Sequence, residues 1–235
     1  MKKLYFLFIL AIACGACSKK TLSPSSPEVL FVGNSLTYAN QMPDILSHIV
    51  GKFGESTTTA SISKPNYALE DHWNDGEFQA MLKKGGIKHV IVQQGPSSQS
   101  YGKESLITYG EKYKTVCTEA GASLGFYMVW PSRRYYYTFD GVIANYSNAA
   151  KHNQAMLFPV GVAWKAYNEN ATGRESLYDS DGFHPSKAGS FLAALTIFHQ
   201  LYPSKDLSQM KLTDYSQWVH DQASFDKMIE LVRGN

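Results

Sequence analysis

Short apolar runs alternate with longer segments of helical periodicity along most of this chain. The runs are rich in β-branched and aromatic residues and are followed by Gly, Pro, Asn or Asp, which is typical of buried strands. They predict strands over residues 28–32, 57–62, 89–93, 123–130 and 156–160. The segments between and after them predict helices from Pro43, over about 77–84, 104–120, within 135–153, over 186–201 and over about 216–232.

Strands that alternate with helical segments predict an α/β fold. We expect a three-layer α/β/α sandwich in which helices cover both faces of a five-stranded parallel sheet. Right-handed crossovers bring the carboxyl ends of such strands to one edge. The loops at Ser35, Asn66, Gln94 and Trp130 are therefore expected to meet there. Residues 64–75, rich in Pro, Asn and Asp, are expected to form one of these loops.

The first sixteen residues have the pattern of an export signal. Two Lys residues precede an apolar segment over residues 4–12, and small residues lead up to Cys17. The apolar segment is too short for a permanent membrane span. The pattern resembles a bacterial lipoprotein signal, in which the Cys is lipidated and becomes the first residue. Cys14 is an alternative lipidation site, and an ordinary cleaved secretory signal is an alternative explanation.

This interpretation divides the chain into three parts. We expect a lipoprotein signal peptide over residues 1–16, a tether over 17–27 and one folded domain over 28–235. The expected location is the bacterial cell envelope, with the membrane contacted only through the lipid on Cys17. The sequence indicates neither the membrane face nor the oligomeric state.

The charge balance argues against a polyanionic partner. Removing Lys2 and Lys3 with the signal leaves twenty Lys and Arg residues against twenty Asp and Glu residues. A neutral chain without a basic run gives no reason to expect nucleic acid as a partner.

A small hydroxyl residue follows the first predicted strand. The sequence Val32-Gly33-Asn34-Ser35 ends an apolar run, and an α/β sheet presents reactive side chains at such a carboxyl edge. Ser35 is therefore a candidate nucleophile. The same composition also suits an ordinary turn after a strand.

A second stretch supplies the partners that a serine nucleophile needs. A serine hydroxyl requires a base, usually His, and that His requires an acceptor that fixes its orientation. In Asp181-Gly182-Phe183-His184-Pro185, a short turn can place the Asp181 carboxylate against the His184 ring. Asp179 is the alternative acceptor. The stretch is also compatible with a helix-entry turn in which Asp181 is a local cap.

Together, the segments 31–37 and 181–186 resemble the first and last sequence blocks of the SGNH hydrolase superfamily, also called GDSL-type esterases. Asn34 stands where that signature usually has Asp. The resemblance implies a flavodoxin-like sandwich and ester hydrolysis through a catalytic triad of Ser35, His184 and Asp181. The Gly-x-Ser-x-Gly motif of other α/β hydrolases is absent, because Thr37 occupies its second Gly position.

The two middle blocks differ from the superfamily pattern. The resemblance implies an oxyanion hole built from the Ser35 N–H, a Gly N–H after the second strand and an Asn side chain after the third. Here Asn66 is the nearest substitute for the Gly, since Asn tolerates left-handed backbone. After the third strand, Gln94-Gly95-Pro96-Ser97 resembles the Gln-Gly-Glu-Ser loop of some carbohydrate acetylesterases in the superfamily. Gln94 or Ser97 is therefore the candidate third donor; a plain strand-to-helix connection is the alternative.

Four further side chains are candidates for substrate binding. His72 and Trp73 follow the second strand, and Arg133 and Tyr135 follow Pro131 at the same expected edge. Each pair is equally compatible with loop packing. No His or Cys pair has ligand-like spacing, so we expect neither a metal nor a cofactor.

These observations predict a membrane-tethered serine esterase. The expected substrate is a small-molecule or glycan ester, and the location and aromatic loops favour acetyl groups on carbohydrate. Lipase or thioesterase activity with the same triad is an alternative. Because the middle blocks are altered, a non-catalytic glycan-binding lipoprotein on the same fold is another.

Overall fold

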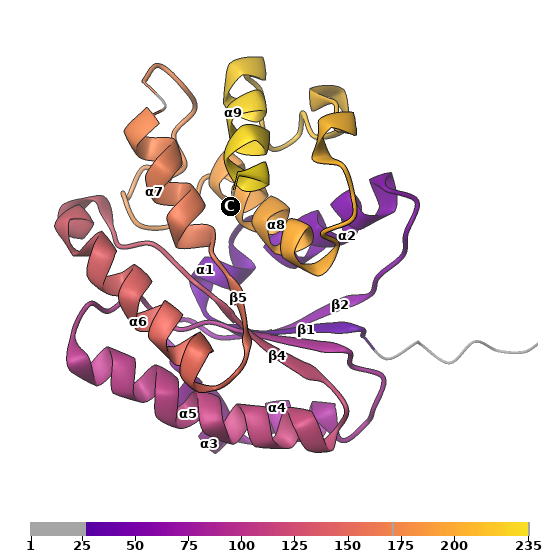
Figure 1. The fold of residues 1–235 in the computed structure, drawn as a ribbon, viewed down its shortest axis with the longest axis vertical. Helices are drawn as coiled ribbons and strands as arrows, with labels where there is room; N and C mark the ends of the chain where they lie inside the picture. The colour runs from indigo at the N-terminus through magenta and orange to yellow at the C-terminus, as the bar shows by residue number, and fades with distance from the viewer. Residues whose placement is uncertain (1–26, 171, 235) are drawn as a thin grey trace, which may run out of the picture.

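The computed structural model describes residues 27–170 and 172–234, and its centre is a sheet of five parallel strands (Figure 1). Across the sheet, in the order β2-β1-β3-β4-β5, the strands are β2 (Thr59–Ser63), β1 (Val29–Gly33), β3 (His89–Val92), β4 (Ser123–Tyr127) and β5 (Met156–Phe158). β1 is buried along its whole length, as expected for a strand covered on both faces.

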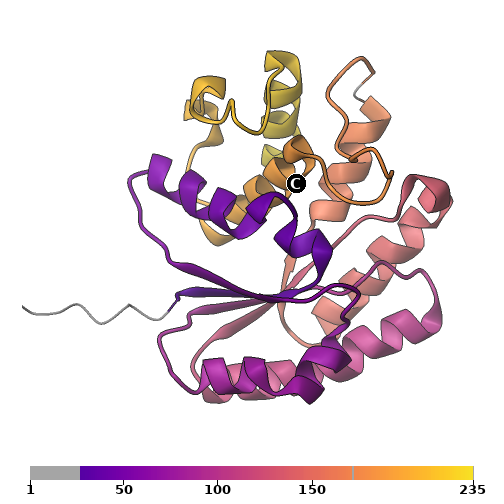
Figure 2. The ribbon, with the colours of Figure 1, turned by 180° about the vertical axis from the view of Figure 1, so that it is seen from behind.

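Helices cover both faces of the sheet, which confirms the predicted three-layer α/β/α fold. One layer contains α2 (Met42–Lys52), α7 (Val160–Asn170), α8 (Lys187–Leu201) and α9 (Gln222–Arg233). Figure 2 shows the other layer most clearly, with α3 (Leu69–Asp75), α4 (Glu77–Leu82), α5 (Ser100–Glu119) and α6 (Phe139–His152). α8 is the most apolar helix, because it packs between α2, α7 and α9. α9 packs on α7 and α8.

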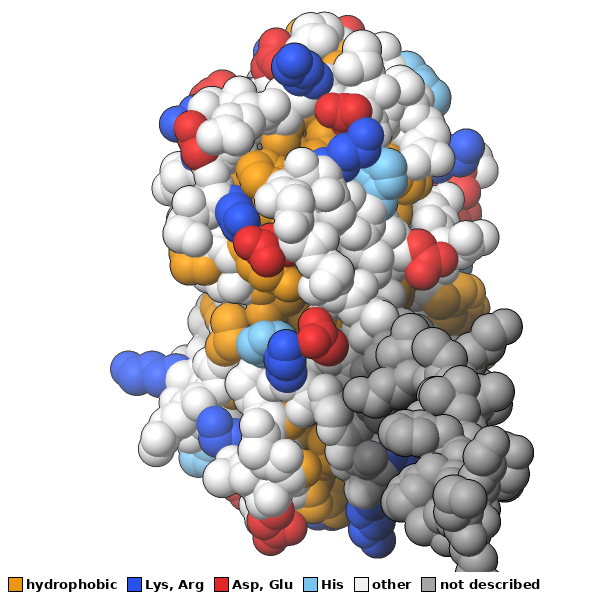
Figure 3. All heavy atoms as spheres, turned by 90° about the vertical axis from the view of Figure 1, so that its right-hand side faces the viewer, with side chains coloured by type: hydrophobic (Ala, Val, Ile, Leu, Met, Phe, Trp, Pro, Cys, Tyr) orange, Lys and Arg blue, Asp and Glu red, His pale blue; other side chains and the backbone are white. Residues whose placement is uncertain are grey.

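The register of the strands brings their carboxyl ends level. Val32 of β1 pairs with Ile62 of β2 and with Val92 of β3. Because the three strands end within a residue of this row, the loops that follow them leave the same edge of the sheet. This edge lies opposite the face seen in Figure 3, where β1 begins and where charged side chains of both signs are scattered over the part that is not grey.

Several predicted boundaries were wrong. Residues 64–75, expected to be loop, contain α3, in which the Asp71 carboxylate accepts a hydrogen bond from the Ala68 N–H at the helix start. The last strand ends at Phe158, and Val160 already begins α7. α5 begins at Ser100 rather than near residue 104, and β4 ends at Tyr127 rather than Trp130. The last helix begins at Gln222 rather than near residue 216.

The proposed signal peptide, the lipidation site at Cys17 or Cys14, and nearly all of the tether lie outside the described residues. Within residues 27–170 and 172–234, none of the helices combines the length and apolar character needed to cross a membrane.

Candidate active site

Ser35 is the first residue of α1 (Ser35–Tyr38), a single helical turn directly after β1. Asn34 caps this turn, because its side-chain oxygen accepts a hydrogen bond from the Leu36 N–H at 3.1 Å. The Asn34 amide nitrogen donates to the Tyr67 carbonyl oxygen at 3.0 Å. Asn34 therefore ties the nucleophile turn to the loop after β2, with a donor that an Asp at this position lacks.

Gln93, which directly follows β3, supports the same turn. Its side-chain oxygen accepts hydrogen bonds from the Asn34 N–H at 2.9 Å and from the Thr37 hydroxyl at 2.8 Å. All three residues are buried, with at most 6% of any of them exposed. Gln93 was not among the predicted site residues, although its position at the end of the predicted strand 89–93 and before Gln94 was a signal for a role at this edge.

His72 does not line the site, and its prediction as a substrate-binding residue was wrong. Its side chain is 1% exposed and lies behind the nucleophile turn, where Nε2 is 2.7 Å from the Gly33 carbonyl oxygen. Because a carbonyl only accepts, Nε2 carries the hydrogen. Nδ1 is buried without a partner among the described residues, and burial lowers the pKa of this His. His72 therefore braces the turn as a neutral ring.

His184 approaches the nucleophile from the loop before α8. Its Nε2 lies 2.9 Å from the Ser35 hydroxyl oxygen, and its Nδ1 lies 2.5 Å from a carboxylate oxygen of Asp181. The carboxylate accepts the Nδ1 hydrogen, which leaves the Nε2 lone pair facing the Ser35 hydroxyl. The structure thus brings Ser35 together with His184, which follows it by 149 positions, and with Asp181. Asp179, the alternative acceptor, instead accepts from the Ser180 N–H.

The Asp181 carboxylate is itself held in place. Its other oxygen accepts hydrogen bonds from the Phe183 N–H at 2.8 Å and from the His184 N–H at 2.9 Å. Hydrogen bonds from the His184 ring and the Phe183 N–H lower the pKa of Asp181 to about 2. The buried Trp130 indole donates to the Phe183 carbonyl oxygen at 3.0 Å, which joins this loop to the segment that follows β4.

A cavity of about 360 Å³ opens beside Ser35, and Asn66, Gln94 and Ser97 all line it. Asn66 has a φ of 62°, the left-handed conformation expected of a substitute for Gly. Among the described residues, the backbone N–H groups of Ser35 and Asn66 have no hydrogen-bond acceptor. Both are therefore available to a ligand in this cavity.

The two candidates for the third donor differ in how many hydrogen bonds their side chains already form. The Gln94 side chain is 5% exposed; its oxygen lies 3.4 Å from the Leu69 N–H and 3.3 Å from the Ser105 hydroxyl, and its nitrogen lies 3.5 Å from the Gly102 carbonyl. The Ser97 hydroxyl oxygen accepts from the Gln99 N–H at 3.2 Å, which leaves its hydrogen unused. Ser97 is thus the freer donor.

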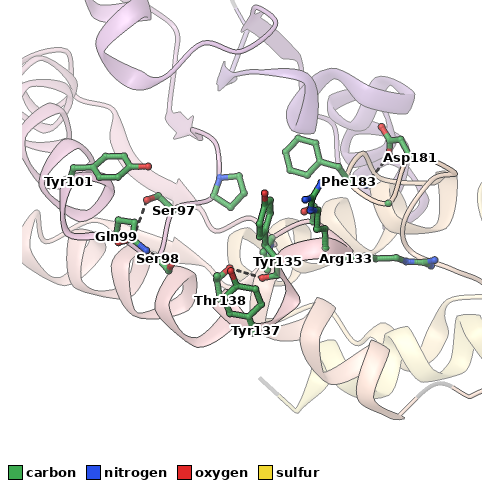
Figure 4. Close-up of a pocket in the computed structure, with 15 residues that line it drawn as sticks. Ser97, Ser98, Gln99, Tyr101, Arg133, Tyr135, Tyr137, Thr138, Asp181 and Phe183 are labelled. Carbon is green, nitrogen blue, oxygen red and sulfur yellow. Dashed lines mark hydrogen bonds between the residues drawn. The ribbon is translucent and has the colours of Figure 1, made fainter.

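A larger cavity of about 920 Å³ adjoins the first and shares Pro96, Ser97, Tyr101 and Phe183 with it. Figure 4 shows Tyr101 on the α5 side and Phe183 on the opposite side, with Tyr135 between them. Tyr101 was not among the predicted site residues, and its ring is exposed on α5.

Two substrate-binding candidates are placed differently from Tyr135. Arg133 lines the larger cavity (Figure 4), but its guanidinium donates to the Ser176 hydroxyl at 2.7 Å and lies over the Tyr178 ring. Trp73 lines neither cavity and packs against Tyr113 of α5. The prediction for Trp73 was wrong, because its ring is occupied by packing within the protein. The role of Arg133 in substrate binding stays a prediction.

Solved structures with the same fold include a protein from Slackia heliotrinireducens described as an SGNH hydrolase. The two share 25% sequence identity with a TM-score of 0.63, over 74% of this chain and 97% of that one. The protein belongs to the SGNH hydrolase superfamily. No protein-family model and no curated protein matches the sequence.

Two structures with lower sequence identity also share the fold of this SGNH hydrolase. A DUF4886 family protein from Bacteroides uniformis has a TM-score of 0.65 at 17% identity, covering 88% of this chain and 93% of that one. An acetyl xylan esterase from Geobacillus stearothermophilus has a TM-score of 0.54 at 11% identity, covering 76% and 94%. Among the described residues of this SGNH hydrolase, no group of three His, Cys, Asp or Glu side chains could hold a metal ion.

Proposed function

We propose that the protein is a serine esterase that cleaves acyl esters, above all acetyl esters of carbohydrates, through Ser35, His184 and Asp181. The observation that carries the proposal is the 2.9 Å approach of His184 Nε2 to the Ser35 hydroxyl, with Asp181 on the other ring nitrogen. A hydroxyl, a base and an acceptor in this order are what nucleophilic acyl transfer requires.

In the first half of the reaction, Ser35 attacks the ester carbonyl while its proton passes to His184 Nε2. The tetrahedral oxyanion forms in the smaller cavity, where the free N–H groups of Ser35 and Asn66 stabilise its charge. The Ser97 hydroxyl is the third donor. His184 then gives its proton to the leaving alcohol, and the acyl group remains on Ser35.

In the second half, His184 takes a proton from water, and the resulting hydroxide attacks the acyl-enzyme. Collapse of the second tetrahedral intermediate returns the proton to Ser35 and releases the acid. Asp181 stays ionised throughout, because its pKa is about 2, and it stabilises the imidazolium that forms twice in each cycle.

The preference for acetylated carbohydrate is supported by two features. Tyrosine rings line the larger cavity beside the nucleophile, and such rings bind sugars by stacking and through their hydroxyls. The fold is shared with an acetyl xylan esterase, among other acylhydrolases. Lipid and thioester substrates belong to the same reaction class and are separated from acetyl sugars by direct assay.

The test compares wild type with Ser35→Ala on p-nitrophenyl acetate and on acetylated xylan. We expect wild type to release acetate from both, and Ser35→Ala to lower kcat by about 10⁴-fold or more. Equal and slow release by both proteins would contradict the esterase proposal. Retention of both proteins on an immobilised glycan would then favour the non-catalytic glycan-binding function.

The cellular location is a separate proposal. We propose that the protein is exported and anchored in the bacterial envelope by a lipid on Cys17. Metabolic labelling with a radioactive fatty acid should mark wild type and Cys14→Ser but not Cys17→Ser. Labelling lost only in Cys14→Ser would move the anchor to Cys14, and an unlabelled, secreted wild type would contradict the anchor.

A further inference from the structure

The proposed mechanism assigns the two cavities to the two halves of an ester. The smaller cavity contains Ser35 and Asn66, whose N–H groups face the oxyanion, so it receives the acyl group. The larger cavity is lined by Asp181, Gly182 and Phe183, the residues directly before His184. Because His184 protonates the leaving oxygen, the alcohol lies on this side. The chemistry of the larger cavity therefore describes the alcohol.

Exposed tyrosine side chains line the larger cavity. Tyr101, Tyr135 and Tyr137 are 69%, 50% and 82% exposed and are among the large apolar side chains that the described part of the chain leaves in solvent. Figure 4 shows Tyr135 and Tyr137 close together on one wall and Tyr101 across from them. Exposed amphipathic rings gathered beside a reactive site indicate a ligand with both apolar faces and hydroxyls, such as a sugar chain.

The charged groups of this cavity leave one cation free. Asp181 is committed to His184, and the Arg133 guanidinium is committed to Ser176 and to the Tyr178 ring. Arg134 lines the cavity, lies 5.7 Å from the centre of the Tyr135 ring and forms no ion pair within residues 27–170 and 172–234. A guanidinium is a fork of donors that matches a carboxylate in two parallel hydrogen bonds.

We propose that the alcohol half of the substrate is a sugar that bears a carboxylate, bound by Arg134 and stacked against the tyrosine rings of the larger cavity. The substrate class is thus an O-acetylated acidic oligosaccharide. This inference rests on the proposed function for the assignment of the two cavities. Its specific content is the charge, since the tyrosines alone accept neutral and acidic sugars alike.

The test uses two substrates of equal length and degree of acetylation. Acetylated oligogalacturonides carry a carboxylate on each sugar, and acetylated xylo-oligosaccharides carry none. The quantity compared is the ratio of kcat/KM for acetate release from the acidic substrate to that from the neutral one. Wild type should favour the acidic substrate. Arg134→Gln should lower the ratio about tenfold, through KM, as the loss of one charged hydrogen-bonded pair implies.

Lys84→Gln is the matched control for net charge. Lys84 is exposed, follows α4 and lines neither cavity. The control should keep the wild-type ratio, and raising the salt concentration should lower the ratio in wild type more than in Arg134→Gln. An equal ratio in wild type and Arg134→Gln, or a wild-type preference for the neutral substrate, would overturn the proposal.

A binding measurement separates this inference from the esterase function. Calorimetric titration of Ser35→Ala with the acetylated oligogalacturonide should show binding that weakens about tenfold in Ser35→Ala/Arg134→Gln. If wild type hydrolyses neither oligosaccharide nor p-nitrophenyl acetate but this Arg134-dependent binding is present, the esterase function fails and the acidic-sugar site stands. If wild type cleaves p-nitrophenyl acetate and the acidic sugar is not bound, the inference alone fails.

Discussion

His72 Nε2 donates a hydrogen bond to the Gly33 carbonyl oxygen at 2.7 Å, directly behind the turn that presents Ser35. The ring is 1% exposed, and its other nitrogen is buried with no partner among the described residues. A protonated His72 would place an unpaired N–H and a charge in the core. The nucleophile turn therefore rests on a His that folds in its neutral form.

This arrangement predicts a pH-dependent contribution to stability. Burial lowers the pKa of His72 in the folded protein, whereas the unfolded value is about 6.5. Below pH 6.5 the unfolded chain binds more protons at this site, so the free energy of unfolding falls as pH falls. His72→Gln should cost about 1 kcal/mol at pH 7.5, from the weakened hydrogen bond. Its deficit relative to wild type should shrink at pH 5, measured by urea denaturation.

Comparison with the variant isolates His72 from the other buried rings. Burial also lowers the pKa of His89 and His199, and both contribute to the acid loss of stability in wild type and variant alike. A deficit that stays constant between pH 7.5 and pH 5 would contradict a neutral, buried His72.

Gly33 is predicted to be irreplaceable for a steric reason. A Cβ at this position would lie 2.4 Å from the Thr37 hydroxyl oxygen and 2.6 Å from the Gln93 side-chain oxygen, the two atoms that bond to each other beneath the turn. Gly33→Ala should lower the free energy of unfolding by about 1–3 kcal/mol and reduce kcat, since the displaced turn carries Ser35. Thermal unfolding and p-nitrophenyl acetate kinetics measure both effects.

Gly51→Ala is the matched control. Gly51 lies in α2, and a Cβ there meets nothing within 4 Å. This variant should gain about 0.4–1 kcal/mol, because Ala restricts the unfolded chain, and should keep wild-type kcat. If Gly33→Ala behaves like Gly51→Ala, the turn is less tightly packed than the structure indicates.

The predicted and observed elements agree where burial decides the local structure. β1 and β3 are short, continuous apolar runs bounded by Gly, Pro or polar residues. The apolar pattern and the residues at its ends are enough to predict such strands. α3 was missed because its sequence, Leu69–Asp75, is polar and rich in acidic residues. It is stabilised by the Asp71 bond to the Ala68 N–H and by burial of Leu69 and His72. Composition alone does not reveal such tertiary support.

α7 was missed for a different reason. The apolar run of β5 continues into Val160, so the strand was extended across the true boundary after Phe158. The pattern of Val160, Ala163, Trp164 and Tyr167 has helical spacing and could have been read as a buried helix face.

In the candidate site, the sequence predicted Ser35, His184 and Asp181, because a nucleophile, a base and an acceptor can be recognised from their residue types. It could not distinguish the exposed Tyr135 from the packed Trp73, because that difference depends on which neighbours the fold supplies.

Asp181 and Asp179 provide a matched pair for testing the orientation of His184. Asp181 contacts the His184 ring, whereas the Asp179 carboxylate accepts, among the described residues, only from the Ser180 N–H. Asp181→Asn should lower kcat by about 10⁴-fold, because an amide does not fix the required tautomer. Asp179→Asn should stay within about threefold of wild type, since the lost contact is exposed and does not involve the His184 ring. A large loss in Asp179→Asn with little change in Asp181→Asn would reverse the assignment.

The pKa of Asp181 also constrains the pH profile. A value of about 2 means that this carboxylate remains ionised from pH 4 upward, which is the range over which the profile of wild-type kcat/KM is to be measured. Protonation of Asp181 therefore does not cause any fall in activity between pH 7 and pH 4. The acid limb of the profile should have the same midpoint in Asp179→Asn as in wild type. A second carboxylate-like midpoint above pH 4 that disappears in Asp181→Asn would contradict this expectation.

The third oxyanion donor is the part of the site where this chain departs most from its superfamily, and the structure favours Ser97 over Gln94. The Gln94 side-chain oxygen accepts from Leu69 and Ser105, and its nitrogen donates to Gly102. Turning this amide to the oxyanion would therefore leave buried groups unpaired. Ser97 uses only its acceptor side, toward the Gln99 N–H, and its hydrogen is free at the border of the two cavities.

Ser97→Ala should therefore lower kcat about a hundredfold with little change in KM and in stability. Ser100→Ala, at the exposed start of α5, should match wild type. Replacing Gln94 by Leu should act mainly on stability, because the buried amide holds the loops together. A kcat loss confined to the Gln94 variant, with Ser97→Ala unchanged, would make Gln94 the donor and would require its amide to leave these contacts when substrate binds.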